Sequence, residues 1–130
     1  MEQSKIIATI PIRTVPESNR GGEHWTAKSK RHKMQKNAVF YCIKPMISNH
    51  PIPLPITITI CRIAPRKLDS HDNLAISLKW IADAIAELFI PGLKIGMADN
   101  DPRITFTYTQ EKGQPKEYAV RIKIEKSIIN

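Results

Sequence analysis

The sequence contains no long hydrophobic run. Its N-terminal apolar stretch, within MEQSKIIATIPIRT, is interrupted by Pro11 and Arg13 and is too short for the apolar core of a secretory signal. No other segment approaches the ~20 apolar residues that a membrane-spanning helix needs. The absence of both features predicts a cytoplasmic protein that does not associate with a membrane.

Cysteine is scarce as well, since the 130 residues include only Cys42 and Cys61. No CxxC pair and no His-rich spacing accompanies them, so a zinc site is not expected. A single pair in a reducing compartment favours two buried free thiols over a disulfide.

Internal repeats and low-complexity segments are absent too. The composition has 42% hydrophobic and 25% charged residues, which is the profile of a folded globular protein rather than of a disordered chain. A chain of this length has room for one hydrophobic core, so residues 1–130 are expected to form a single domain.

Acidic residues are rare in the first half of the chain. Residues 1–67 contain 12 Lys and Arg but only 3 Asp and Glu, whereas residues 68–130 contain 8 and 9, so the net charge of +8 divides into +9 and −1. A basic half of this kind suits a polyanion, because neutralising phosphates releases counterions. On charge alone, a solvated basic surface explains the pattern equally well.

Hydrophobic periodicity and turn residues predict four strands and two helices. The strands are expected at residues 6–12, 56–63, 103–110 and 117–125, and the helices at 26–44, ended by Pro45, and at about 70–89. Residues 111–116 are expected to join the last two strands as a hairpin. The order predicts the α+β class, with a small mixed sheet of about four strands and both helices against one face.

Helical spacing also predicts which face of each helix is buried. The expected inner positions are Met34, Ala38, Tyr41 and Cys42 in the first helix, and Leu74, Leu78, Ile81, Ile85 and Leu88 in the second. At ~100° per residue, Asp72, Lys79 and Asp83 fall together on the polar face of the second helix.

Acidic residues stand where the second strand ends and the second helix begins, in the stretch RKLDSHDNL. Asp69 and Asp72 lie in this loop, and Asp99 and Asp101 lie in the loop before the third strand. If both loops share one end of the sheet, their carboxylates converge near a point. Hard oxygen ligands of this kind suit Mg²⁺ beside a substrate phosphate.

A second interpretation assigns these residues to local structure alone. An acidic N-cap at Asp69, with Asp72 three positions on, would satisfy free amide groups and suit the helix dipole. Residues 99–102 are also an ordinary turn sequence. Lys79 could form a plain surface pair with Asp83, or it could reach a phosphate from its place on the order of 10 Å along the helix from Asp72. Spacing alone leaves both interpretations open.

Two longer stretches, KLDSHDNLAISLKWIADAIAELF and ADNDPRITFTYTQEKGQPKEYAVRIKIE, resemble the RusA family of Holliday junction resolvases, especially its phage-borne members. The P-x-S-N motif that begins at Pro16, and the pair His24-Trp25, resemble the start of the same family. The resemblance implies a homodimeric, Mg²⁺-dependent endonuclease that binds four-way DNA junctions and makes paired nicks.

The resemblance also carries the family's functional residues onto this chain. Asp72 matches the aspartate of the family's Asp-Asn-Leu motif, and Asp99 or Asp101 matches its acidic loop. Lys79 corresponds to the functional lysine of the family's helix if a three-residue insertion after Leu74 is accepted.

Two positions depart from the family's pattern. Ser70 stands two places before the Asp-Asn pair, where well-known members have an aspartate, and the nearest aspartate here is Asp69. His71 stands where phage relatives often carry another acid. It could support a metal ligand or bind a softer metal itself, and solvent exposure is the first expectation for it.

The mechanism that follows from these assignments is metal-assisted phosphodiester hydrolysis. Asp69, Asp72 and Asp99 are expected to bind Mg²⁺, or Mn²⁺ in its place. Asp101 is a reserve ligand, and Lys79 stabilises developing negative charge. The expected DNA phosphate contacts are Arg13, Arg20, Lys28, Arg31, Lys33, Lys36, Arg66 and Lys67.

The alternative is a non-catalytic protein that binds DNA junctions on the same scaffold. It predicts salt-sensitive binding without cleavage in any divalent ion. A basic RNA-binding domain is less favoured, because the strands show no aromatic pair placed for base stacking.

Overall fold

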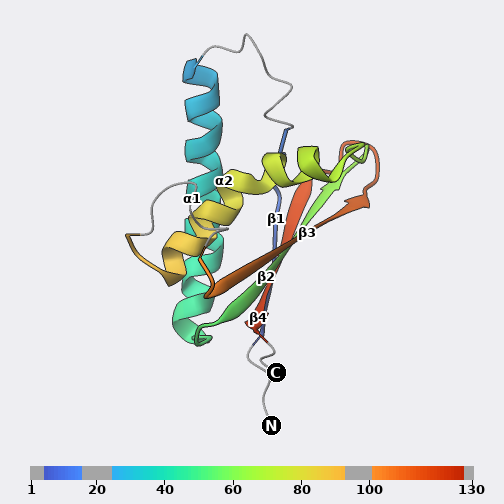
Figure 1. The fold of residues 1–130 in the computed structure, drawn as a ribbon. Helices are drawn as coiled ribbons and strands as arrows, with labels where there is room; N and C mark the ends of the chain where they lie inside the picture. The colour runs from blue at the N-terminus through green and yellow to red at the C-terminus, as the bar shows by residue number, and fades with distance from the viewer. Residues whose placement is uncertain (1–4, 16–24, 93–100, 128–130) are drawn as a thin grey trace.

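The computed structural model describes residues 5–15, 25–92 and 101–127, and Figure 1 shows how their helices and strands are arranged. The elements are β1 (Lys5–Ile10), α1 (Trp25–Asn49), β2 (Ile56–Ala64), α2 (His71–Phe89), β3 (Ile104–Lys112) and β4 (Ala119–Lys126). This is the predicted order, and the α+β class is confirmed. Within these three ranges, no helix is both long enough and apolar enough to cross a membrane.

The four strands form one mixed sheet in the order β1-β4-β2-β3. β4 is antiparallel to β1 and to β2, while β2 and β3 are parallel. The predicted hairpin between the last two strands is therefore wrong, because β2 lies between them. Seven of the nine residues of β2 are buried, and a place inside the sheet buries such an apolar strand better than an edge would.

The connection from β3 to β4 passes across the end of β2. The amide of Gly113 donates a hydrogen bond to the carbonyl of Ala64 at 2.7 Å. A Cβ at position 113 would lie 3.1 Å from Cγ2 of Ile63 and 2.8 Å from Oε1 of Glu117. The close approach of the two backbones is therefore possible because this residue has no side chain.

Three strands end at the same edge of the sheet. Since β1 and β2 are both antiparallel to β4, they run in the same direction as each other and as β3. The segments that follow these strands, residues 11–15, 65–70 and 113–118, meet at this edge, which we call the carboxyl end of the sheet. Ligands of open α/β sheets commonly bind outside the carboxyl ends of the strands.

Both helices pack against one face of the sheet, as predicted (Figure 1). The core between the two layers is built mainly from Val39, Ile43, Ile58, Ile60, Leu78, Ile81, Ile85, Ile122 and Ile124. The predicted stripe of α2 lies in this core, since Leu74 is fully enclosed and Leu88 packs at the margin.

The first helix is longer than predicted. α1 continues through Pro45 to Asn49, although the sequence pattern predicts an end at the proline. Pro45 removes one backbone hydrogen bond of the helix. Met46 and Ile47 beyond it pack against the core, and this contact holds the last turn in place.

The buried face of α1 also differs from the prediction. Met34 is 61% exposed and Tyr41 is 75% exposed, and only Ala38 of the four expected residues packs against the core. The buried residues are Gln35, Val39 and Ile43, which are one turn apart. Apolar residues lie on several sides of this helix, so their spacing did not define the inner face.

Both cysteines are free thiols, as expected. Cys61 is buried beside Ile63 and Ala119 on the sheet face that points away from the helices. Cys42 is exposed on α1, so the prediction of a buried thiol is wrong at this position.

Candidate functional site

A side chain of β3 holds the loop after β2 in place. Oε1 of Gln110 accepts a hydrogen bond from the amide of Leu68 at 2.8 Å, and Nε2 donates to the carbonyl of Leu68 at 2.9 Å. The glutamine amide thus pairs with both backbone groups of one loop residue, as a neighbouring strand would. Residues 65–70 therefore have a fixed position relative to β3.

A buried arginine of β2 supports the same loop. Arg62 is 7% exposed, and its Nη1 donates to the carbonyl of Arg66 at 2.9 Å while its Nε donates to Oγ1 of Thr14 at 3.2 Å. Burial lowers the pKa of Arg62, the nearby charge of Arg13 lowers it further, and Tyr118 acts in the opposite direction. The guanidinium connects the segment after β1 to the loop after β2.

At the start of α2, a serine and not an acidic residue caps the helix. Ser70 is the N-cap, and its hydroxyl accepts a hydrogen bond from the amide of Asn73 at 3.1 Å. The predicted capping role of Asp69 is therefore wrong. Oδ1 of Asp69 instead accepts from Nδ2 of Asn73 at 3.3 Å, and Asp69, Asp72 and His71 are all exposed.

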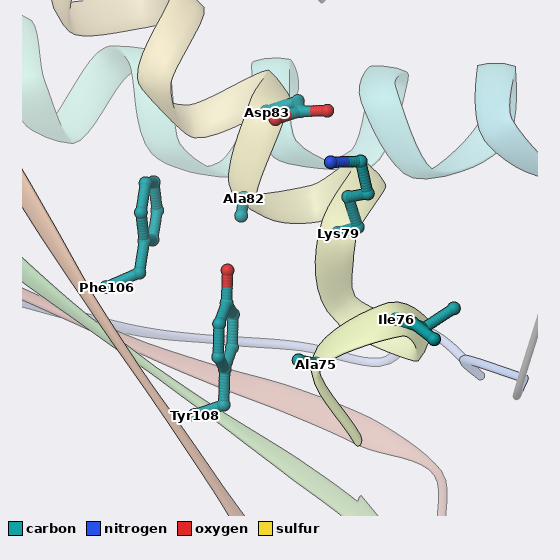
Figure 2. Close-up of a pocket in the computed structure, with 7 residues that line it drawn as sticks. All are labelled: Ala75, Ile76, Lys79, Ala82, Asp83, Phe106 and Tyr108. Atoms are coloured by element: carbon teal, nitrogen blue, oxygen red, sulfur yellow. The ribbon is translucent and has the colours of Figure 1, made fainter. Parts of the chain in front are cut away.

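Lys79 and Asp83 line a pocket of about 210 Å³ between α2 and β3. Figure 2 shows these two side chains projecting from α2, with Phe106 and Tyr108 rising from β3 toward the helix. Ala75, Ile76 and Ala82 complete the lining. Of the three residues predicted to share the polar face of α2, Lys79 and Asp83 line this pocket beside β3, and Asp72 does not.

The two aromatic side chains of β3 form a pair. The rings of Phe106 and Tyr108 are parallel to within 2°, with centroids 6.2 Å apart. β3 therefore carries an aromatic pair, whereas the prediction was that no pair is placed for base stacking. Both rings are partly buried against the core beside α2, whereas sheet-based RNA recognition uses aromatic rings on an open sheet surface.

Asp101 lies at the opposite end of the sheet from Asp69. β3 is parallel to β2 with Ile104 beside Ile56, so residues that precede β3 lie near the start of β2. From Ile104 to Gln110 the strand rises on the order of 20 Å, at ~3.3 Å per residue. The predicted convergence of Asp101 with the loop carboxylates is therefore wrong within one chain.

Asp101 instead organises the turn before β3. Its carboxylate accepts hydrogen bonds from the amide of Arg103 at 2.9 Å, from Nε at 2.9 Å and from Nη2 at 2.7 Å. The side-chain bonds, followed by the backbone bond, lower the pKa of Asp101 from 3.8 to about 2. The turn interpretation is confirmed at this residue, and Asp99 lies outside the described residues.

Cationic side chains surround the loop after β2. Arg66 and Lys67 are exposed in the loop itself. Arg13 lies in the segment after β1, with its guanidinium carbon 4.5 Å from the centroid of the Tyr118 ring. Four of the other predicted DNA contacts lie on α1, namely Lys28, Arg31, Lys33 and Lys36. Nζ of Lys36 lies 3.5 Å from Oε2 of Glu87 in α2. Arg20 lies outside the described residues.

Asp69 and Asp72 are two exposed carboxylates at the carboxyl end of the sheet that a metal ion could use. In the part of the chain that the structure describes, no three His, Cys, Asp or Glu side chains come together. Mg²⁺ commonly binds through one or two carboxylates, several waters and substrate phosphates, so the pair meets that requirement.

Two residues of this site, Arg62 and Gln110, were not among the predicted ones. They are direct partners in the register of β2 and β3. Each occupies the helix-facing parity of its strand, after the apolar positions Ile60 and Tyr108. A polar residue at the inward end of an alternating strand was therefore the available signal.

Comparison with known proteins assigns the chain to no family. No family model matches the chain, and no curated protein matches it. The resemblance to the RusA family therefore rests on the sequence motifs alone.

Proposed function

We propose that this protein is a metal-dependent endonuclease that resolves four-way DNA junctions, with residues 65–70 as its active-site loop and Asp72 beside it in the first turn of α2. The observation that carries the proposal is the division of roles around Ser70. Ser70 caps α2, so the carboxylates of Asp69 and Asp72 are both exposed. Asp69 lies in a loop held by side chains of β2 and β3, and Asp72 lies in the first turn of α2. Exposed carboxylates beside cations favour metal-assisted chemistry on a phosphate chain.

In this proposal Asp69 and Asp72 would hold Mg²⁺, and Mn²⁺ would suit the same oxygen ligands. The bound ion would activate a water molecule and neutralise charge on the scissile phosphate. The side chain of Asn73 donates a hydrogen bond to Asp69, and α2 carries both Asp72 and Lys79, which are on the order of 10 Å apart along the helix. The Lys79 ammonium would stabilise negative charge on the DNA.

The substrate is proposed from the charges around the loop. Arg13, Arg66 and Lys67 would contact phosphates and position the DNA without reading its sequence. A four-way junction is recognised by its shape, and paired nicks require two active sites. A symmetric homodimer would supply both.

The proposal is tested by cleavage of a labelled synthetic four-way junction, with Mg²⁺ and then with EDTA. The wild type is expected to make paired nicks that require the ion. Asp72→Asn is expected to lower the nicking rate on the order of 100-fold or more while binding persists. Glu125→Gln, a matched loss of charge at the opposite end of the sheet, should nick normally. Wild-type nicking by Asp72→Asn would remove this carboxylate from the mechanism.

A second candidate is a junction-binding protein without nuclease activity. The position of Asp101 favours it, because this carboxylate is bound to Arg103 and lies at the far end of β3 from the loop. The candidate predicts salt-sensitive junction binding with no nicks in Mg²⁺ or Mn²⁺. The same cleavage assay therefore separates the two functions.

A further inference from the structure

The connection between β3 and β4 contains a tight turn at residues 114–117. The amide of Glu117 donates a hydrogen bond to the carbonyl of Gln114 at 3.0 Å, and Pro115 and Lys116 are the two central residues. Lys116 has a φ of 65°. A proline at the first central position and a positive φ at the second are typical of a type II turn. The turn therefore has a lysine at the position where glycine or asparagine is favoured.

Lysine is not the residue that stability alone would favour at position 116. In the left-handed conformation the Cβ of an L-residue comes close to the following carbonyl oxygen, and glycine avoids this contact because it has no Cβ. Lys116 is exposed, and among the described residues no ion pair includes it. Strained backbone conformations cluster at binding and catalytic sites. The exposed side chain is therefore a candidate for a function outside the fold.

The turn lies beside the proposed active-site loop. The amide of Gly113 donates to the carbonyl of Ala64 at 2.7 Å, and Ala64 is the last residue of β2, directly before residues 65–70. Figure 1 shows the connection from β3 to β4 next to the segment that joins β2 to α2. Lys116 is therefore at the same end of the sheet as Arg66 and Lys67.

The acidic side chains near the turn already have partners. Oε1 of Glu117 accepts a hydrogen bond from the amide of Gln114 at 2.7 Å. Oε2 of Glu111 accepts from Nη1 of Arg121 at 2.8 Å. Both carboxylates are therefore bound to groups of the chain, whereas the ammonium group of Lys116 is exposed to solvent. An exposed ammonium group at this end of the sheet suits a phosphate oxygen.

We propose that Lys116 binds a backbone phosphate of the DNA that lies at the active-site loop, and that the type II turn holds the lysine in place for this contact. The inference rests on the proposed function, which brings DNA to this end of the sheet. The contact would extend phosphate binding from the loop after β2 to the connection between β3 and β4. Lysine meets a phosphate as a point charge, so the contact carries no sequence information.

Lys116→Asn tests the proposal. Asparagine tolerates a positive φ, so the midpoint of thermal unfolding should rise by roughly 3 °C. Loss of the ammonium group should weaken binding of a labelled four-way junction in EDTA roughly tenfold. It should also reduce the slope of log K against log salt by about 0.9, the value for one phosphate contact. A lower midpoint, or junction binding as tight as that of the wild type, would overturn the proposal.

Two further variants are matched controls. Lys126→Asn removes the same charge beside the start of β2, at the opposite end of the sheet, and should leave affinity and slope unchanged. Lys116→Arg keeps the positive charge in the same turn, so its affinity should stay near that of the wild type. Equal losses for Lys116→Asn and Lys126→Asn would contradict the contact. A loss for Lys116→Arg as large as that for Lys116→Asn would contradict it too.

Nicking in Mg²⁺ is measured separately from binding. If the wild type nicks the junction and Lys116→Asn binds it normally, only the lysine contact is refuted. If the wild type binds the junction without nicking it, and Lys116→Asn binds more weakly, only the nuclease is refuted. A wild type that binds no junction would overturn both.

Discussion

Around Ser70, neighbouring side chains have separate tasks. The Ser70 hydroxyl satisfies the amide of Asn73, and Asp69 accepts a hydrogen bond from the side chain of the same asparagine. Asp72 is exposed in the first turn, where its charge interacts favourably with the helix dipole. Substitutions at these positions should therefore separate stability from chemistry.

Ser70→Ala tests the cap. It should lower the free energy of unfolding by about 1 kcal/mol, because the amide of Asn73 loses its acceptor. Asp69→Asn retains an oxygen that can accept from Asn73 and should change the free energy by less than ~0.5 kcal/mol. Chemical denaturation of both variants measures the difference. A larger loss from Asp69→Asn than from Ser70→Ala would return the capping role to Asp69.

Asp101 gives a prediction about pH. Its pKa lies at about 2 instead of 3.8, chiefly because Arg103 donates hydrogen bonds to it. The stabilising contribution of a carboxylate with a lowered pKa is complete above pH 3.8 and is lost as the pH falls toward 2. Arg103→Ala should return the pKa of Asp101 toward 3.8, as followed by NMR titration of its carboxyl carbon. A pKa that stayed near 2 would mean that another group lowers it.

At the scale of elements, the active-site loop depends on the strands beside it. Gln110→Met keeps the approximate volume of the side chain but removes both hydrogen bonds to Leu68. The free energy of unfolding should fall by about 1–3 kcal/mol, because the backbone groups of Leu68 lose their partner. The nicking rate should fall as well, while junction binding is retained, since the cations remain but the carboxylates are no longer positioned.

Gln110→Glu is a companion variant for this prediction. It keeps the acceptor for the amide of Leu68, but its second carboxylate oxygen faces the Leu68 carbonyl and adds a negative charge, so the nicking rate is expected to stay below that of the wild type. Rate and affinity are measured separately on the same junction. If nicking rate and junction affinity fell together, Gln110 would stabilise the fold in general and would not specifically position the loop.

Local sequence patterns predicted the helices and strands better than they predicted which strands pair in the sheet. The stripe that begins at Leu74 and Leu78 runs along one side of α2, so its spacing identified the buried face. In α1, the hydrophobic residues Met34 and Tyr41 are exposed while Val39 is buried, so spacing did not distinguish exposed from buried positions. The hairpin prediction followed nearness in sequence, whereas the observed pairing buries β2 between β4 and β3, which is a property of the whole sheet.

At the candidate site, too, local sequence patterns predicted the residues of one segment but not the residues that strand pairing brings to it. The exposed positions of Asp69 and Asp72 depend on one short segment, the end of the loop and the first turn of α2, and the sequence was sufficient to identify that segment. The place of Asp101 depends on the direction of β3, and parallel pairing with β2 puts this residue at the other end of the sheet. The roles of Arg62 and Gln110 depend on the same pairing, because the two residues are direct partners in it.

At the scale of the whole molecule, part of the positive charge lies at the carboxyl end of the sheet. Arg13, Arg62, Arg66 and Lys67 lie at the carboxyl end of the sheet, in the strands and loops that support the acidic residues. Composition alone gave a basic half without a location. The strand directions place part of that charge beside Asp69, so DNA binding and cleavage are proposed to share one end of the molecule.

The location can be tested through salt dependence. Replacing Arg66 and Lys67 together by alanine should weaken junction binding and reduce the slope of log K against log salt by about 0.9 for each lost phosphate contact. Replacing Lys5 and Lys126 removes the same charge at the opposite end and should leave the slope unchanged. Binding is measured with EDTA over a range of salt concentrations. Equal slopes for the two double variants would mean that DNA binding depends on net charge alone. DNA would then not be bound at the carboxyl end of the sheet, and the proposed cleavage by Asp69 and Asp72 would be contradicted.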